Sequence, residues 1–510
     1  MMEKFMERGI IRQRGITLIA LVITIIVLLI LAGVTIAALS GDNGILTRAA
    51  ESKNKTEEAQ EKEGLKLAVT SSQMEDVNTL EIDKEKLENA IRQQFGNNKD
   101  FSVTDNKDGS FLVSMNDTGR MYYIDDTGEV IDQSKILKIS TADELKSFRD
   151  NVNIGKTYEG WYVYLANNIT LDINEEWEPI GYYSQDTTSV KEVLQNKNNR
   201  PFSGIFDGME HIIDNLYINT SDEVQGIFGL VIDGKIKNIM LGENSKVSMT
   251  GGSSGGIVGY MYGTGAIINC KNYANIEQTS GGIVGRVAGS ITVSNCLNYG
   301  ELKDAIGGIV GTSNGTDWED FVNVSNIISN CANYGNIFSA SGNFRGGIVG
   351  FFKGDIFNSF NLGNVTAKGI DVGGISGEIY GNIENCYNIA DVSTSQGNVG
   401  GLTGALTGNI INSYSIANIT GNYSKGPFCG YKFTGTVENC YSKNDEFNAS
   451  SLGKAFKEDA NDINNGYPIL QWQWWLGRNI PVFYLSKSHS FCEFCCCCYI
   501  YYLYYYIYYP

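Results

Sequence analysis

Two neighbouring segments have nearly the same pattern: "GGIVGYMYGTGAIINCKNYANI", Gly255–Ile276, and "GGIVGRVAGSITVSNCLNYGEL", Gly281–Leu302. Both begin with a glycine pair, continue with branched apolar residues and end in the same Asn-Cys and Asn-Tyr steps. The glycine pair then recurs at spacings of 26, 26, 39, 27, 27 and 26 residues. The later copies start at Gly307, Gly346, Gly373 and Gly400, and a worn copy starts at Gly426. A fixed period of this length indicates a repeat architecture.

Each repeat is expected to be a set of short strands separated by glycine corners, and an earlier degenerate copy begins at Gly226. One apolar column holds Ile257, Ile283, Ile309, Ile348, Ile375 and Leu402. A second column holds Cys270, Cys296, Cys331, Ser359, Cys386, Ser413 and Cys440. A unit this small cannot bury a core alone, but stacked coils can, at about 4.8 Å per coil. The pattern predicts a mainly β fold, a right-handed β-helix-like solenoid whose seven coils would measure about 30–35 Å.

The cysteine column is interpreted as a row of small buried side chains. Ser359 and Ser413 replace Cys without disturbing the pattern, which argues against obligatory disulfides. A metal ladder is not expected, because no His or second Cys accompanies each position. Free Cys behaves as a small hydrophobe in protein cores, so stacked structural thiols are predicted.

The repeats resemble the GLUG-motif family of bacterial surface proteins, which is named for Gly-rich units of the "GGIVG" kind. The stretches Ser140–Gly181 and Pro201–Asn219 resemble the segment that precedes such repeats, and "NDINNGYPILQWQ", Asn461–Gln473, resembles the segment that closes them. The resemblance covers about Ser140 to Gln473. It implies a secreted or anchored surface protein of adhesin-like character, with a glycan or surface-protein ligand that the family does not define.

The N-terminal region predicts a membrane anchor. Ile16–Leu39 contains no charged residue and would span roughly 36 Å as a helix, which exceeds a bilayer core of about 30 Å. The basic residues Lys4, Arg8, Arg12 and Arg14 all precede it, so the leader is expected in the cytoplasm and the rest outside. This predicts a single-pass membrane protein with an extracellular C-terminal region at the cell surface.

The boundary before the apolar run resembles the class III signal of type IV pilins and pseudopilins. The basic leader, residues 1–15, ends in Gly15, and the run begins at Ile16. The resemblance implies a prepilin peptidase as a partner, cleavage after Gly15 and N-methylation of Ile16. The family usually has Phe first and Glu fifth after the cut, where this chain has Ile16 and Ala20. Without that carboxylate nothing offsets burial of an amine in a filament, which argues against assembly.

The sequence predicts eight parts. The N-terminal ones are a leader (1–15), a transmembrane helix (16–40), a polar stalk helix (41–63) and a small α+β, pilin-like domain (64–135). They are followed by a solenoid cap with first coils (136–225), the GLUG-like solenoid (226–445), a closing segment (446–485) and a Cys/Tyr-rich tail (486–510). The tail has five Cys and eight Tyr, and either a misread gene end or a genuine tail would explain it.

Three local patterns support the parts on either side of residue 135. Asp83–Gly96 has the spacing and end signals of a helix, and the residues from Phe101 to Ile131 read as three strands. Thr141–Asn153 predicts a second helix with Glu144 at the capping-box position. An apolar helix there could cover the open edge of the first coil.

Composition excludes several functions for this chain of 510 residues. A net charge of −18 and a pI near 4.7 argue against nucleic-acid binding. The chain has two histidines, so imidazole-dependent nucleophiles and multi-His metal sites are not expected, and neither is a cofactor. Hydrolysis by a pair of carboxylates remains open.

The long 39-residue spacing marks a loop, Thr312–Ser325, that is the predicted ligand site. Trp318 lies there among Asp317, Glu319 and Asp320, a combination that could stack on a sugar or hold Ca²⁺, although an acidic solvated loop explains it as well. The acidic residues of the array share no evident column, which argues against a carbohydrate-active enzyme. These are Asp304, Asp355, Asp371, Glu378, Glu384 and Asp391.

The sequence therefore predicts a non-enzymatic, membrane-anchored surface protein that presents a β-solenoid for adhesion to glycan, matrix or cell-surface partners. The alternative is a structural subunit of a type IV pilus or pseudopilus. A β-helix enzyme acting on carbohydrate is the third reading.

Overall fold

The structure is a computed structural model that describes residues 45–74, 82–105, 110–125, 127–184, 196–222, 224–249, 252–313, 325–460, 464 and 466–473. The chain divides into two compact units, one ending at Lys135 and the other beginning at Ile136. Each unit is described by itself. Gly15, Ile16 and the apolar run 16–39 lie outside the described residues, as does the tail 486–510.

The first unit is a long helix and a short helix on an antiparallel sheet. Its helices are α2 (Ile45–Met74) and α3 (Lys84–Phe95). Its strands, in the sheet order β1-β2-β3-β4, are Phe101–Asp105, Phe111–Met115, Arg120–Ile124 and Val130–Asp132, followed by the 3-10 turn η1, Gln133–Lys135. The sequence predicted three strands here, and the sheet has a fourth, β4, which pairs antiparallel with β3.

The helix α2 does not end near residue 63 but continues to Met74. Its second half carries Leu65, Ala68 and Val69, all nearly inaccessible, and these pack into the core formed with α3 and the sheet. Burial of that apolar face extends the polar helix predicted from the sequence. The predicted end signals of α3 are confirmed, because Asp83 accepts hydrogen bonds from the backbone N–H of Glu85 and Lys86, and Gly96 follows with φ +87°.

The second unit confirms the β-solenoid, which has about ten turns. One sheet, here sheet II, has ten parallel strands, one per coil. They are β7 (Ile169–Thr170), β9 (Ile212–Asp214), β14 (Met240–Leu241), β18 (Lys271–Asn272), β21 (Leu297–Asn298), β25 (Ala332–Asn333), β29 (Phe360–Asn361), β34 (Tyr387–Asn388), β39 (Tyr414–Ser415) and β44 (Tyr441–Ser442). Two of these coils, β7 and β9, precede the repeats recognised in the sequence.

The longest face of the solenoid is a sixteen-stranded sheet, here sheet I. Its strands are β5 (Ile136–Ile139), β6 (Tyr162–Leu165), β8 (Ile205–Asp207), β12 (Phe228–Ile232), β13 (Lys235–Lys237), β17 (Val258–Ile268), β20 (Val284–Ser294), β23 (Val310–Ser313), β24 (Asn326–Ser329), β28 (Val349–Phe357), β32 (Ser376–Tyr380), β33 (Ile383–Glu384), β37 (Thr403–Thr407), β38 (Ile410–Ile411), β42 (Cys429–Thr434) and β43 (Val437–Glu438).

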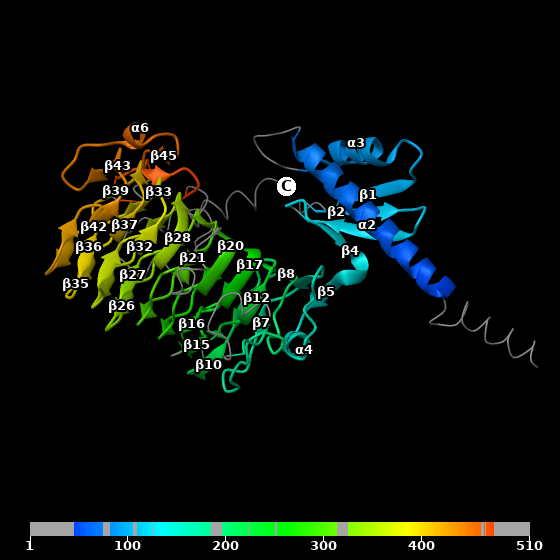
Figure 1. Cartoon of the computed structure of the whole chain (residues 1–510), viewed down its shortest axis with the longest axis horizontal. Helices are drawn as coiled ribbons and strands as arrows, with labels where there is room; N and C mark the ends of the chain where they lie inside the picture. The colour runs from blue at the N-terminus through cyan, green and yellow to red at the C-terminus, as the bar shows by residue number, and fades with distance from the viewer. Residues whose placement is uncertain are drawn as a thin grey trace, which may run out of the picture. The chain divides into compact units, whose positions relative to one another are not determined.

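Three smaller groups of strands complete the coils. Sheet III contains β10 (Tyr217–Thr220), β15 (Lys246–Met249), β19 (Ile276–Glu277), β22 (Leu302–Lys303), β26 (Ile337–Ser339), β30 (Val365–Ala367), β35 (Val392–Thr394) and β40 (Ile419–Gly421). Sheet IV contains β27 (Phe344–Gly346), β31 (Asp371–Gly373), β36 (Asn398–Gly400) and β41 (Lys425–Gly426), and β11 (Val224–Gln225) pairs with β16 (Ser253–Ser254). Figure 1 shows these coils stacked from α4 at one end to β42 at the other.

The three glycines of each "GGxxG" motif are required by close backbone approach. In the coil that begins at Gly373, a Cβ on that residue would lie 2.2 Å from the carbonyl oxygen of Ser376. A Cβ on Gly374 would lie 2.3 Å from Cγ of Asn388, and one on Gly377 would lie 2.5 Å from the backbone nitrogen of Arg345. The motif therefore lets one coil lie against the next and lets sheet IV cross the strand of sheet I.

Asparagine makes the sharp corner between sheets I and II. Eight asparagines, each directly before a Cys/Ser position or its counterpart in the degenerate copy, have φ between 46° and 56°. They are Asn238, Asn269, Asn295, Asn330, Asn358, Asn385, Asn412 and Asn439. Asn tolerates this left-handed conformation better than other residues with a side chain.

A second row of asparagines forms a buried amide ladder inside the solenoid. Its members are Asn272, Asn298, Asn333, Asn361 and Asn388, all fully inaccessible. The Nδ2 of each of the first four donates to Oδ1 of the next coil's asparagine at 2.7–2.8 Å, and all five donate to a backbone carbonyl two residues ahead. Both amide hydrogens of those four are thereby satisfied, which is what burial of a polar side chain requires.

The cysteine column is confirmed as a row of free thiols. The six cysteines that the structure describes form no disulfide. The Sγ of Cys296 lies 3.3 Å from the carbonyl of Ser294, and Ser359 fills the same position with a hydroxyl bonded 2.8 Å from the carbonyl of Phe357. Burial raises the pKa of the Cys386 thiol to about 12, so this thiol is unreactive at neutral pH.

The first coil is covered by the predicted helix, α4 (Ala142–Asn153). Thr141 accepts a hydrogen bond from the Glu144 backbone N–H, and the Glu144 carboxylate accepts one from Ser140 N–H. Leu145, Phe148 and Val152 insert into the solenoid core. The helix closes this end of the apolar column, as predicted.

The closing segment covers a side of the solenoid rather than its end. It contains α6 (Ala449–Leu452) and the strands β45 (Phe456–Lys457) and β46 (Ile469–Leu470), which pair antiparallel. Its apolar residues pack on the stacked rings of Phe360, Tyr387 and Tyr414 on the outer face of sheet II. Trp472 donates to the carbonyl of Asn358 at 2.8 Å, so the segment runs back over earlier coils.

The predicted localisation is wrong. None of the helices in the described ranges combines the length and the apolar character that a membrane span requires. The longest of them, α2, has 30 residues, but charged residues occur along most of it. The residues on which the prediction of an anchor rested are outside the described part of the chain.

Candidate functional site

The predicted ligand loop cannot be placed, since Asp317, Trp318, Glu319 and Asp320 fall within 314–324, outside the described residues. Its point of attachment is described. Thr312 pairs with Arg286, and Ile327 pairs with Thr292, so the insertion replaces the middle of one strand of sheet I. The described part of the chain contains no group of three His, Cys, Asp or Glu side chains that could hold a metal ion.

An outward-facing column runs along sheet I from β12 to β42. It contains Leu230, Tyr260, Arg286, Thr312, Phe351, Glu378, Ala405 and Tyr431, which follow one another in register. The residue after most of these positions, for example Phe352 or Ile379, is fully buried in the main core. Because neighbouring residues of a strand face opposite sides, the column lies on the outside of the sheet.

Near the middle of this column, the glycine corner brings two carboxylates together. Asp371 precedes the corner on β31 of sheet IV, and Glu378 follows it on β32 of sheet I. The chain folds back between them, so each carboxylate lies within electrostatic reach of the other. Both residues are nearly buried, with 7% and 8% of their surfaces exposed.

Aromatic rings of the same two coils flank the carboxylates. Phe344 is the register partner of Asp371, and Phe351 is the partner of Glu378. The ring of Phe351 lies 5.3 Å from that of Phe344 and 5.7 Å from that of Tyr380. The corner cluster is defined here as Phe344, Phe351, Asp371, Glu378 and Tyr380.

Burial raises the pKa of both carboxylates. It raises the pKa of Glu378, which the charge of Asp371 raises further and a hydrogen bond from Tyr380 partly opposes. Burial also raises the pKa of Asp371, against a 2.7 Å hydrogen bond from Nδ2 of Asn398. In the protonated form each carboxyl group can donate a hydrogen bond as well as accept one. The cluster can therefore donate to, and accept from, the hydroxyl groups of a ligand.

Other acidic residues named from the sequence have structural roles. Oδ1 of Asp355 accepts from the backbone and side chain of Asn382, and Oδ1 of Asp391 accepts in the same way from Asn418. Asp304 accepts from the backbone N–H of Ala340. These carboxylates hold one coil to the next, as Asp371 does through Asn398, but of the six acidic residues named from the sequence it is Asp371 and Glu378 that are nearly buried.

Sequence reasoning missed the corner cluster because it searched for residues that share one column. Asp371 and Glu378 are seven residues apart within "DVGGISGE". A search for polar residues on both sides of a glycine corner would have found them, since the two arms of the corner are in contact.

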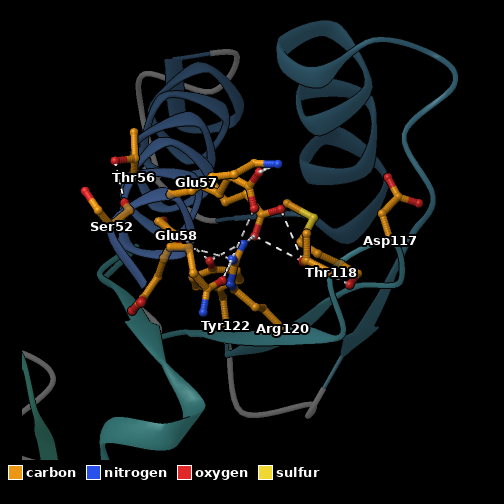
Figure 2. Close-up of polar contacts among 12 residues, drawn as sticks. Ser52, Thr56, Glu57, Glu58, Asp117, Thr118, Arg120 and Tyr122 are labelled. Carbon is orange, nitrogen blue, oxygen red and sulfur yellow. Dashed lines mark hydrogen bonds and ion pairs between the residues drawn. The ribbon is translucent and has the colours of Figure 1, made fainter. Parts of the chain in front are cut away.

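A second polar cluster, in the first unit, is best explained as structural. Glu61 on α2 is 6% exposed and accepts from Arg120 at 3.0 Å, Tyr122 at 3.1 Å and Lys99 at 3.2 Å. Figure 2 shows Arg120 and Tyr122 reaching from the sheet toward the helix. Burial alone would raise the pKa of Glu61, but these hydrogen bonds lower it. Every partner belongs to the same unit, so the cluster fixes the helix to the sheet.

Comparison with known proteins gives little further information. No family model and no curated protein matches the chain. One similar solved structure is described as a "putative immunoglobulin A1 protease" from Bacteroides ovatus, with 22% identity over 67% of this chain and 93% of that one. The TM-score is 0.42, so this likeness supports no statement about activity.

Proposed function

We propose that the solenoid is an adhesin-like binding protein whose corner cluster holds a hydroxyl-rich, uncharged glycan. The observation that carries the proposal is the pair Asp371 and Glu378 beside the rings of Phe351 and Tyr380. Aromatic rings offer an apolar face to a sugar ring, and the carboxyl groups offer hydrogen bonds to its hydroxyls. A net charge of −18 favours an uncharged glycan over an acidic one.

The outward column supports an extended ligand. It places Arg286 and Thr312, both half-buried, on coils to one side of the cluster and the exposed Tyr431 on a coil to the other side, whereas Tyr260 and Ala405 are covered. The guanidinium of Arg286 lies 5.1 Å from the ring centre of Tyr260. Contacts repeated from coil to coil would suit a polymer that is bound weakly at each site and firmly overall.

The test is titration of the full chain with a panel of neutral and acidic polysaccharides. Glu378→Gln and Asp371→Asn should each weaken binding of a neutral polysaccharide about fivefold to tenfold, which corresponds to one lost hydrogen bond. Glu384→Gln, on the same coil but outside the cluster, is the matched control and should leave affinity unchanged. Loss of binding on Trp318→Ala with no effect of the corner variants would move the site to the inserted loop. Shortened oligosaccharides in the mixture would indicate an enzyme.

The second candidate is a pilus or pseudopilus subunit, and the first unit supplies the observation that favours it. The first half of α2 is largely exposed, while its second half packs on an antiparallel sheet, an outline that pilins share with other small α+β domains. Mass spectrometry of the native N-terminus tests it. A peptide that starts at N-methylated Ile16 would favour this candidate, and one that starts at Met1 would oppose it.

A further inference from the structure

In the part of the chain that the structure describes, the last coil of the solenoid has an unpaired edge, here called the open edge. In the described part of the chain each of its strands has a neighbour on one side: β42 pairs with β37, β43 with β38, β44 with β39, and β41 with β36. The eight-stranded sheet III ends one strand earlier, at β40. An unpaired edge of this kind is a template for pairing with another chain.

Three aromatic side chains are exposed at this edge, and for Tyr431 the register partner further in is covered. Tyr423, Tyr431 and Phe433 are 63%, 47% and 58% exposed. The rings of Tyr431 and Phe433 lie 4.7 Å apart. Ala405, the register partner of Tyr431 on the preceding coil, is 1% exposed. Grouped exposed aromatic rings of this kind mark interaction surfaces in soluble proteins.

The other end of the solenoid is closed, which restricts how copies can associate. The helix α4 inserts three apolar side chains into the core beside the first strand, β5. A head-to-tail stack, in which the last coil of one copy meets the first coil of the next, is therefore blocked. Two last coils can still meet through a two-fold axis, which gives a closed pair and no fibre.

The described part of the closing segment leads away from the edge. After β44 the chain crosses sheet II, and Trp472 and Gln473 contact residues of earlier coils, Asn358 and Tyr387. The edge itself carries charges of both signs, Lys425 and Lys432 on one part and Glu438 on another. A surface with both signs can be complementary to itself after a two-fold rotation.

We infer that the open edge of the last coil binds a second copy of this chain, tail to tail, through strand pairing around Tyr431 and Phe433. The inference is independent of the proposed glycan site. The same pairing would join the outward columns of two solenoids, because Tyr431 is the last member of each column.

Sedimentation of the full chain over a concentration series tests this inference. The unaltered chain should form dimers, and Phe433→Lys and Tyr431→Lys should each raise the dimer dissociation constant at least about tenfold. Phe338→Lys is the matched control, since Phe338 is 51% exposed on sheet III away from the edge, and it should leave the dimer intact. A thermal melt confirms that each variant is folded.

Two results would overturn the inference. One is a chain that remains monomeric at every concentration, and the other is a dimer that persists in both edge variants. Hydrogen exchange separates the remaining cases, because pairing between copies protects the β42 amides only at dimer-forming concentrations. Protection that does not depend on concentration would assign the edge to residues 474–510 of the same chain and would also refute the inference.

Discussion

The middle coils and the last coil share one motif and differ in how much of it is buried. In the coil that begins at Gly346, Ile348 and Asn361 are fully inaccessible. In the coil that begins at Gly426, the corresponding Phe428 and Ser442 are only half-buried. The sequence of a coil therefore determines which positions can be buried, and the coil that follows it provides the contacts that bury them. Stability in such an array is a sum of interfaces between neighbours.

The largest expected effect comes from placing a side chain where two middle coils meet. A Cβ on Gly347 would lie 2.1 Å from the carbonyl oxygen of Gly374 and 2.3 Å from Cγ of Asn361. Gly347→Ala should destabilise the second unit by about 3 kcal/mol or more, measured by urea unfolding. Gly252→Ala is the control, since no atom lies within 4 Å of its Cβ position, and it should change little. Equal effects of the two would disprove the close-approach explanation.

Breaking the amide ladder should have the next largest effect. Asn333→Ala removes the donor to Oδ1 of Asn361 and leaves the Gly335 carbonyl without its partner. The expected loss is about 2–3 kcal/mol, the cost of unsatisfied buried polar groups. In a later coil Ser415 holds the same position, and Ser415→Ala should lose less than about 1 kcal/mol. A larger loss at Ser415 than at Asn333 would refute the ladder's importance.

The pH dependence should distinguish buried from exposed acids. The raised pKa values of Asp371 and Glu378 mean that the folded state holds protons more tightly than the unfolded state. Their contribution is therefore most favourable below the unfolded pKa of about 4 and is lost as pH rises through the folded value. Glu378→Gln should stabilise the second unit at pH 8 by about 1 kcal/mol and flatten this dependence, as followed by urea unfolding at pH 5 and 8.

The matched variant for the pH experiment is in the last coil. Glu438 is exposed, so Glu438→Gln relieves no burial and should leave stability at both pH values unchanged. For Glu61 in the first unit, we expect the contribution to stability to change with pH in the opposite direction. Its pKa is lowered, so its contribution is present above about pH 4.5 and is lost as pH falls through the folded value. If the stability of the two units changed with pH in the same direction, the result would contradict both the raised pKa values of Asp371 and Glu378 and the lowered pKa of Glu61.

The smallest effect is expected from extending the ladder. Asn388 is the last asparagine of the row, and the next coil has Ser415 in its place. Ser415→Asn should offer Nδ2 of Asn388 a further acceptor and stabilise the last coils by about 0.5–1 kcal/mol. Hydrogen exchange at β39 and β44 would detect the gain, and faster exchange there would show that the ladder cannot be continued.

The sequence predicted the solenoid because its period is carried by residues whose preferences are simple. The glycines, the branched apolar column and the cysteine column all indicate small or apolar buried positions, and each was confirmed. The asparagine ladder has the same period, but a polar residue does not reveal its burial until its partner is known. The proximity of the two carboxylates in the corner cluster can be predicted only when the fold of that corner is known. The path of the closing segment depends on contacts between residues over a hundred positions apart.

The direction of the amide ladder bears on how such a chain can evolve. Every inner asparagine accepts from the coil before it and donates to the coil after it, so a duplicated coil inserted in the row finds both partners in place. The 35-residue step from Asn298 to Asn333 keeps the same 2.7 Å bond as its shorter neighbours, so extra residues can be accommodated without breaking the row. We expect natural relatives to differ in length by whole coils or by insertions at that loop. The number of coils and the length and sequence of that loop can then change independently during evolution.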